Sequence, residues 1–142
     1  MSEPSFVTGQ RVDWGDCDAA GIVFYPNFYR WMDGHYHVFT AACGFDQRKL
    51  LSTYGLLGTP LRQTGCTFVS PTRFGDTLII SSRLKSMTET SLSLAYHFSR
   101  SGTTIAEGFE VRVMVRERDG VIEKTDIPDP IRTALADYLV LS

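Results

Sequence analysis

Hydrophobic positions recur with a helical period in the first third of the chain. Between Asn27 and Cys43 apolar side chains return every three or four residues, which predicts a helix with one wide buried stripe. Pro26 stands at or next to its first position and Gly44 directly after its last, as is typical of the two helix ends. The stripe comprises Phe28, Trp31, Met32, Tyr36, Phe39 and Cys43. A helix this apolar is expected to pack against a sheet.

Alternation of apolar and polar residues dominates the rest of the chain. It is strictest at Leu92, Leu94, Tyr96 and Phe98, which predicts a strand with one buried face. We expect strands over Phe6–Trp14, Thr59–Val69, Thr77–Lys85, Ser91–Ser99 and Thr103–Arg118, with turns at the glycines between them. In the last strand the predicted buried side carries Ile105, Phe109, Val111, Val113 and Val115.

Two further helices complete the predicted order of elements. One covers Asp46–Tyr54, and a short terminal helix has Asp129 as its N-cap and Pro130 as its first residue. Because the strands are grouped after a long helix, the order indicates an α+β fold, in which an antiparallel sheet packs against that helix. A length of 142 residues predicts a single domain over residues 1–142.

Composition narrows the class of protein. The 14 basic and 16 acidic side chains give a net charge of −2, so we expect no sequence-independent binding to nucleic acid. No apolar run reaches the length of a membrane helix, and the first residues lack the pattern of a signal peptide. The cysteines, Cys17, Cys43 and Cys66, are too few and scattered for a disulfide framework. Free thiols and a cytoplasmic location are therefore expected.

The densest polar cluster is Asp16-Cys17-Asp18, between the first strand and the long helix. A loop carboxylate is usually solvated. Here the flanking residues are apolar, so partial desolvation of Asp18, which would raise its basicity, is the alternative. The loop also leads into a helix N-terminus, where free N–H groups can stabilise an oxyanion. Such a carboxylate could attack an acyl carbonyl or activate water.

A second candidate carboxylate, Asp33, lies on the long helix itself. Its spacing from His37 predicts an ordinary ion pair on one helix face, and no third residue is placed to complete a metal site. The chain contains no phosphate-binding glycine loop, no dinucleotide fingerprint and no nucleophile elbow. We therefore expect neither a metal nor a cofactor.

The segment from Trp14 to Asp33 closely resembles the active-site segment of the hotdog-fold acyl-CoA thioesterases, and within them the 4-hydroxybenzoyl-CoA thioesterases of the pseudomonad type. The resemblance extends through Gly58-Thr59-Pro60 and the later strands, so it covers nearly the whole chain. It implies an antiparallel sheet wrapped around one long central helix. The implied activity is hydrolysis of an acyl-CoA thioester, with 4-hydroxybenzoyl-CoA or benzoyl-CoA as the expected substrates.

The resemblance also implies roles for individual residues. Asp18 corresponds to the catalytic aspartate, a nucleophile or general base, and the backbone N–H of Tyr25 would polarise the thioester carbonyl. Gly21 would allow close approach of the backbone to the substrate. Asp33 corresponds to the helix aspartate that hydrogen-bonds the ring hydroxyl, and it follows Trp31, which we place in the same substrate site.

Two departures from the family pattern bear on the substrate. Ala19 stands where the 4-hydroxybenzoyl enzyme has a proline, and the hairpin from Lys85 to Thr90 lacks the basic cluster that contacts the nucleotide end of CoA. Contacts to the CoA phosphates would then fall elsewhere, with Arg100 and Arg116 as candidates. The choice between CoA and a carrier protein as the thiol carrier stays open.

The resemblance implies a homo-oligomer, since family sites form between two protomers. We expect a tetramer whose minimal active unit is a dimer. The alternatives are a housekeeping thioesterase acting on short-chain or carrier-linked acyl groups and a non-catalytic acyl-binding module. The residues Phe24-Tyr25-Pro26 and the intact Asp18, respectively, argue against them.

Overall fold

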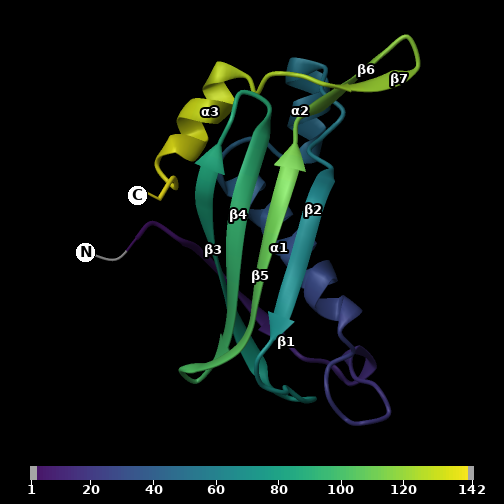
Figure 1. Ribbon diagram of the computed structural model, residues 1–142, viewed down its shortest axis with the longest axis vertical. Helices are drawn as coiled ribbons and strands as arrows, with labels where there is room; N and C mark the ends of the chain where they lie inside the picture. Colours follow the sequence, from purple (N-terminus) through teal and green to yellow (C-terminus); the bar gives the residue numbers. More distant parts are fainter. Residues whose placement is uncertain (1–2, 141–142) are drawn as a thin grey trace.

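A five-stranded antiparallel sheet backed by one long helix forms the body of the protein in a computed structural model that describes residues 3–140 (Figure 1). The strand order is β1-β3-β4-β5-β2, so β1 and β2 form the two edges. The strands are β1 (Phe6–Arg11), β2 (Leu61–Phe68), β3 (Thr77–Met87), β4 (Ser91–Arg100) and β5 (Thr103–Val113). This architecture confirms the predicted α+β class.

The long helix α1 (Pro26–Ala42) lies across one face of this sheet and buries the predicted stripe. Six of its buried residues are Phe28, Trp31, Met32, His35, Tyr36 and Phe39. The helix approaches β5 most closely at Gly108, where an added Cβ would lie 2.5 Å from the sulfur of Met32. The missing side chain at this position therefore lets the helix pack directly on the strand.

The shorter helices match the predictions closely. Helix α2 (Gln47–Tyr54) is capped by the side chain of Asp46, which accepts a hydrogen bond from the Lys49 N–H at 2.8 Å. Helix α3 (Asp129–Ala136) begins at Asp129, with Pro128 as its N-cap, so the predicted cap lies one residue too late. None of the helices within residues 3–140 is long and apolar enough to cross a membrane.

The last predicted strand is two strands. Strand β5 ends at Val113, and after the buried Met114 the chain continues as β6 (Val115–Arg118), which pairs with β7 (Val121–Lys124) in a separate ribbon. The two residues of the connecting turn, Asp119 and Gly120, both have positive φ, which suits a tight hairpin. The first strand is also shorter than predicted, because residues Trp14–Asp16 form a turn of 3-10 helix, η1.

The predicted buried face of β5 is wrong in its middle. Phe109 is 41% exposed, whereas its neighbours Glu110 and Arg112 are buried against α1. Side chains alternate across a strand, so the two faces were exchanged here. The hydrophobic pattern misleads because the inner face carries a charged pair whose members satisfy each other.

Candidate active site

The loop between η1 and α1 is anchored to the helix by Asp16. Its side chain is buried, with one oxygen accepting from the Asp13 N–H at 2.8 Å and the other from the Arg30 guanidinium at 2.8 Å. Its backbone oxygen accepts from the Asn27 amide and from the Phe24 N–H, each at 2.8 Å. These bonds hold the loop together and fix it to the first turns of α1 through Asn27 and Arg30, and both carboxylate oxygens of Asp16 are engaged within the chain.

Asp18 is placed differently, although only one residue separates the two aspartates. It is exposed in this single chain, as is usual for a loop carboxylate, and the alternative of partial desolvation is not seen. Its Oδ1 accepts from the Ala20 N–H at 2.8 Å, and its Oδ2 has no hydrogen-bond partner among residues 3–140. The turn closes through Gly21, whose φ of 79° favours glycine and whose N–H donates to the Asp18 carbonyl. Asp18 thus retains a carboxylate oxygen that can react.

The N-terminus of α1 supplies a hydrogen-bond donor beside this carboxylate. Tyr25 precedes the first helical residue, and its backbone N–H has no acceptor in the described part of the chain. The next residue, Pro26, has no N–H to compete for a ligand. Free N–H groups and the positive end of the helix dipole together favour an anionic oxygen at this point.

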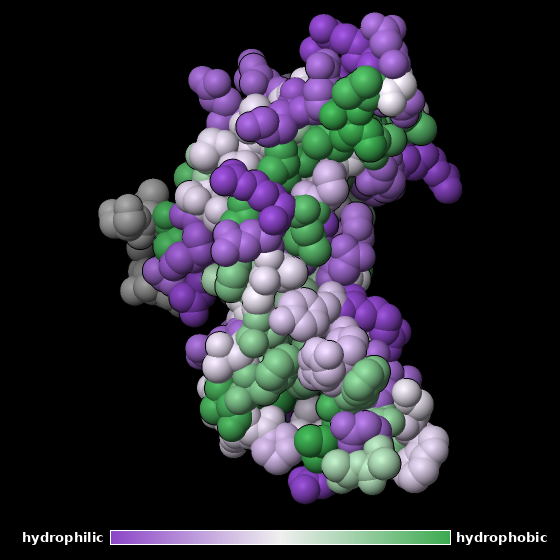
Figure 2. Space-filling view, turned by 45° about the vertical axis from the view of Figure 1, so that its right-hand side comes forward, coloured by the Kyte–Doolittle hydropathy of each residue, from purple (hydrophilic) through white to green (hydrophobic). Residues whose placement is uncertain are grey.

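Asp18 and Tyr25 line one cavity of about 440 Å³. Its other lining residues are Ile22, Val23, Phe28, Phe68, Val69, Ser70, Pro71 and Thr72. The walls are mainly apolar, and Figure 2 shows exposed hydrophobic residues, in green, around the lower end of the molecule where this loop lies. A mainly apolar pocket with one carboxylate and one free N–H can hold an acyl group and polarise its carbonyl.

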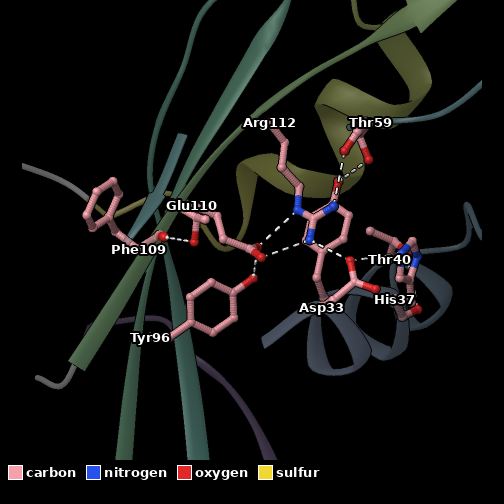
Figure 3. A network of polar contacts seen from close by, with 10 residues as sticks. Asp33, His37, Thr40, Thr59, Tyr96, Phe109, Glu110 and Arg112 are labelled. Atoms are coloured by element: carbon pink, nitrogen blue, oxygen red, sulfur yellow. Dashed lines mark hydrogen bonds and ion pairs between the residues drawn. The ribbon is translucent and has the colours of Figure 1, made fainter. Parts of the chain in front are cut away.

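Asp33 belongs to a second cluster, at the junction of α1 and β5 (Figure 3). Its Oδ1 lies 2.9 Å from Nη2 of Arg112 and 3.5 Å from Nε2 of His37, the predicted helix partner. Arg112 also donates from Nε and Nη2 to Glu110, at 3.0 and 2.9 Å, and from Nη1 to the Thr59 carbonyl at 3.1 Å. The guanidinium is therefore held on every side.

Aromatic side chains enclose this cluster. The Arg112 guanidinium lies 3.8 Å from the centre of the Tyr36 ring, and the Tyr96 hydroxyl donates to Glu110. Burial raises the pKa of Tyr36 to about 12, and it raises the pKa of Tyr96 as well, with the adjacent Glu110 charge adding to the effect. Both phenols stay protonated at neutral pH and can donate to their partners. Glu110, Arg112 and the two tyrosines accordingly form a hydrogen-bonded polar network inside the core, and Asp33 joins it from the exposed face of α1.

A separate cavity of about 320 Å³ opens beside Asp33, lined also by Thr59, Pro60, Leu61 and Arg112. In one chain, then, the structure brings Asp18 and Tyr25 together but leaves Asp33 in another cavity. Within residues 3–140 no three His, Cys, Asp or Glu side chains are grouped to hold a metal ion.

Trp31 also lies outside the cavity of Asp18. It is only 4% exposed and belongs to the core, where its ring packs edge-on against Phe28 with the ring centres 5.4 Å apart. Phe28 in turn lines the Asp18 cavity, so Trp31 supports the wall of that cavity from behind. Its Nε1 is buried and has no partner among the described residues.

The two arginines suggested for CoA phosphates are engaged elsewhere. Arg100 pairs with Asp76 at 2.9 Å, and Arg116 pairs with Glu123 at 2.7 Å. The backbone N–H of Arg73 is the main cause that lowers the pKa of Asp76, so this carboxylate is charged and available to Arg100 at neutral pH. Sequence reasoning missed Glu110 and Arg112 as site residues. The available signal was their spacing of two within a strand, which places opposite charges on one face.

The fold and the site together define a hotdog-fold enzyme of acyl thioesters. Residues 12–135 match the Thioesterase-like superfamily, to which the chain belongs. It is 31% identical over 96% of both chains to the 4-hydroxybenzoyl-CoA thioesterase of Pseudomonas sp. strain CBS-3. The structure of that enzyme superposes with a TM-score of 0.87 at 27% identity, covering 92% of this chain and 99% of the other.

Two more relatives have names that specify other acyl groups. A gentisyl-coenzyme A thioesterase superposes with a TM-score of 0.80 at 37% identity, covering 92% of this chain and 99% of the other. A 1,4-dihydroxy-2-naphthoyl-CoA hydrolase of Thermosynechococcus vestitus is 27% identical over 86% of this chain and 82% of its own. These relatives establish the present chain as a thioester hydrolase acting on acyl-CoA.

Proposed function

We propose that the protein hydrolyses the CoA thioester of a hydroxylated aromatic acid, with 4-hydroxybenzoyl-CoA as the first candidate. The observation that carries the proposal is that Asp18, which has an unengaged carboxylate oxygen, and Tyr25, which has a free backbone N–H, line the same mainly apolar cavity. The names of three relatives add support, because 4-hydroxybenzoyl, gentisyl and dihydroxynaphthoyl groups are all aromatic acyl groups with ring hydroxyls.

In the proposed reaction the thioester carbonyl oxygen accepts a hydrogen bond from the Tyr25 N–H. The negative charge that develops on this oxygen is stabilised by that donor and by the helix dipole. The Asp18 carboxylate then either attacks the carbonyl carbon or removes a proton from an attacking water. In both routes a C–O bond forms, the C–S bond breaks and CoA leaves as the thiolate, which takes up a proton. In the first route the acyl group is then held on Asp18 as an anhydride, and attack of water on this anhydride releases the acid and restores the carboxylate. Gly21 keeps the backbone beside the thioester free of a side chain.

The position of edge strand β2 indicates how a second copy of the chain would complete the site. The Asp18 cavity lies at its end, near Phe68, and the Asp33 cavity at its start, near Leu61. Two copies of one edge strand that pair antiparallel about a two-fold axis place the start of one against the end of the other. Such pairing would bring Asp33 of the second copy to the cavity of Asp18.

The proposed site between two copies, with Asp18 from one and Asp33 from the other, suits a phenolic substrate. Asp33 is 54% exposed at its side chain, and its Oδ2 accepts no hydrogen bond within residues 3–140. A carboxylate with a free oxygen accepts strongly from a ring hydroxyl. We propose that Asp33 accepts a hydrogen bond from this hydroxyl. Trp31 supports the pocket for the aromatic ring through its contact with Phe28.

The remaining parts of the proposal concern assembly and location. We propose a homodimer as the minimal active unit, paired into a tetramer, with residues 1–142 as one domain. The cytoplasm is the proposed location, because Cys17, Cys43 and Cys66 are free thiols. Light scattering tests the assembly, and a monomer that hydrolyses acyl-CoA would contradict the shared site.

A substrate panel tests the function. We would compare kcat/KM for 4-hydroxybenzoyl-CoA, benzoyl-CoA, phenylacetyl-CoA and short aliphatic acyl-CoAs, in the wild type and in Asp33→Ala. The expected result is a preference for the hydroxylated substrate that is lost in Asp33→Ala, since an unpaired buried hydroxyl costs about 1–3 kcal/mol. A flat or aliphatic profile would reject the proposed substrate and favour the alternative, a housekeeping thioesterase of short-chain or carrier-linked acyl groups.

A further inference from the structure

One oxygen of Asp33 is bound and the other is free, and the cause lies on the neighbouring strand. Arg112 presents five N–H groups in a planar fork, a geometry that commonly binds both oxygens of one carboxylate. Here the fork formed by Nε and Nη2 is occupied by Glu110. The other fork, formed by Nη1 and Nη2, is divided between the Thr59 carbonyl and Asp33, so a single hydrogen bond, from Nη2 to Oδ1 at 2.9 Å, remains for Asp33.

We propose that Arg112 is a positioning residue for substrate specificity, and that Glu110 determines how it acts. Arg112 fixes the Asp33 carboxylate in one orientation through Oδ1. Glu110, by occupying Nε and Nη2, together with the Thr59 carbonyl on Nη1, leaves Oδ2 available to the ring hydroxyl of the substrate. This inference deepens the proposed function and rests on the assignment of Asp33 to that hydroxyl.

The surroundings of Arg112 make it rigid enough for this task. Its side chain is 3% exposed and that of Glu110 is 1% exposed, so bulk water does not compete for the hydrogen bonds between them. The Tyr36 ring covers the guanidinium. The Thr59 carbonyl accepts from Nη1, and the Tyr96 hydroxyl fixes Glu110 (Figure 3). Asp33, by contrast, stands on an exposed helix face, where a carboxylate without a fixed partner would rotate.

The charges support the same assignment. Glu110 neutralises Arg112 inside the core, where an isolated charge would be very costly. Asp33 is then the one carboxylate of the three-residue cluster that reaches solvent. A phenolic hydroxyl, as a neutral donor, can bind its free oxygen without bringing a further charge. A second carboxylate on the substrate would be repelled.

The test compares hydroxyl preference, defined as the ratio of kcat/KM for 4-hydroxybenzoyl-CoA to that for benzoyl-CoA. The main variant is the double substitution Glu110→Gln with Arg112→Met, which removes both buried charges together and keeps an acceptor for the Tyr96 hydroxyl. Replacing a buried ion pair as a unit is tolerated far better than removing one partner. A second variant, Arg112→Lys, keeps the charge but loses the planar fork. Arg83→Met is the matched control, because Arg83 lies on β3 with its side chain 46% exposed.

We expect the hydroxyl preference to fall about tenfold in the double variant, because KM for the hydroxylated substrate rises much more than KM for benzoyl-CoA. In an Asp33→Ala background the same double substitution should change the preference no further, since a positioning residue acts only through the group it positions. Arg112→Lys should show a smaller loss of preference, and Arg83→Met none.

The possible outcomes distinguish a failure of the proposed function from a failure of the positioning role of Arg112. If the wild type has no hydroxyl preference, or if Asp33→Ala retains it, the proposed function fails. If Asp33→Ala loses the preference but the folded double variant and Arg112→Lys both keep it, the positioning role alone is overturned. An equal loss on both substrates, or a further loss in the Asp33→Ala background, would also overturn it, because a merely structural role predicts those results. Thermal melting identifies the variants that fold.

Discussion

The carboxylate of Asp16 lies 2.8 Å from the guanidinium of Arg30, across the junction between a loop and the helix that follows it. This ion pair distinguishes two aspartates that the sequence presents almost side by side. Asp16 fixes the position of the loop, and Asp18, two residues later, projects from the fixed loop into the cavity with one oxygen unengaged. The division of roles leads to opposite predictions for the two residues.

Replacing Asp18, the carboxylate proposed to react, should strongly lower turnover but leave the fold intact. We expect Asp18→Asn to lower kcat by about 10²–10⁴-fold, the usual contribution of a base or of an activated attacking group, with a much smaller change in KM. Steady-state kinetics with an aryl-CoA substrate measure the effect, and a melting temperature equal to that of wild type serves as the control. Near-normal turnover in this variant would remove Asp18 from the chemistry.

Replacing Asp16 should instead cost stability. The Asp16→Asn variant loses the charge opposite Arg30 at a buried site, so we expect a loss of about 1–2 kcal/mol in the free energy of unfolding. Urea denaturation gives the value, and Asp126→Asn, at an exposed position, is the matched control. A variant as stable as wild type would show that the loop does not depend on this pair.

The close approach of α1 to the sheet predicts a steric effect at Gly108. A Cβ there would lie 2.5 Å from the sulfur of the fully buried Met32 and 3.2 Å from the Gly65 carbonyl. We expect Gly108→Ala to destabilise the protein by about 1–3 kcal/mol, the usual cost of overpacking. Gly9→Ala on β1 is the control, since nothing lies within 4 Å of its added Cβ and little change is expected. Equal stability of the two variants would contradict the described packing.

A buried histidine predicts how stability depends on pH. His35 is 4% exposed, with Thr8 Oγ1 at 2.6 Å from Nδ1 and Ser82 Oγ at 2.7 Å from Nε2, and burial lowers its pKa from 6.5 to about 4. Between pH 6.5 and 4 the unfolded chain binds a proton that the folded chain does not. Stability should therefore fall as the pH drops through this window, by up to about 3 kcal/mol from this group.

The measurement is denaturant unfolding at a series of pH values. In His35→Gln the slope between pH 6.5 and 4 should become shallower, because the group that binds the proton is gone. His37→Gln, which removes a half-exposed ring on the same helix, should retain the wild-type slope. An unchanged slope in His35→Gln would assign the acid sensitivity to other groups.

The sequence predictions are accurate for features that depend on neighbouring residues and fail for features that depend on contacts distant in the sequence. Helix α1 and strand β4 were predicted within one residue of their bounds because their periodicity is strong and uninterrupted. The prediction for strand β5 failed in its middle because Glu110 and Arg112, although charged, face the core, where they pair with each other and where Arg112 also contacts Asp33 and Thr59, far along the chain. The sequence also does not reveal the break between β5 and β6, because Met114 at the break is apolar and buried like its neighbours Val113 and Val115.

The candidate site divides in the same way. The loop motif with its two aspartates pointed to the carboxylate cavity, but residue order alone could not say which aspartate the fold engages. Asp33 was identified as a candidate, whereas its contact with Arg112 joins residues 79 positions apart and depends on the packing of α1 on β5. The position of Trp31 in the core likewise depends on that packing.

The order of the strands has a consequence for how the chain folds. Strands β3, β4 and β5 follow one another through short hairpins, whereas both edge strands pair with partners far along the chain, Phe6 with Ser82 and Leu61 with Arg112. Closing long loops costs chain entropy before any contact compensates for it. We therefore expect the central meander to acquire amide protection first. The Asp18 cavity, the proposed active site, lies between the segment after β1 and the end of β2, so it should form last. The chain would then acquire activity only when its most distant contacts are in place.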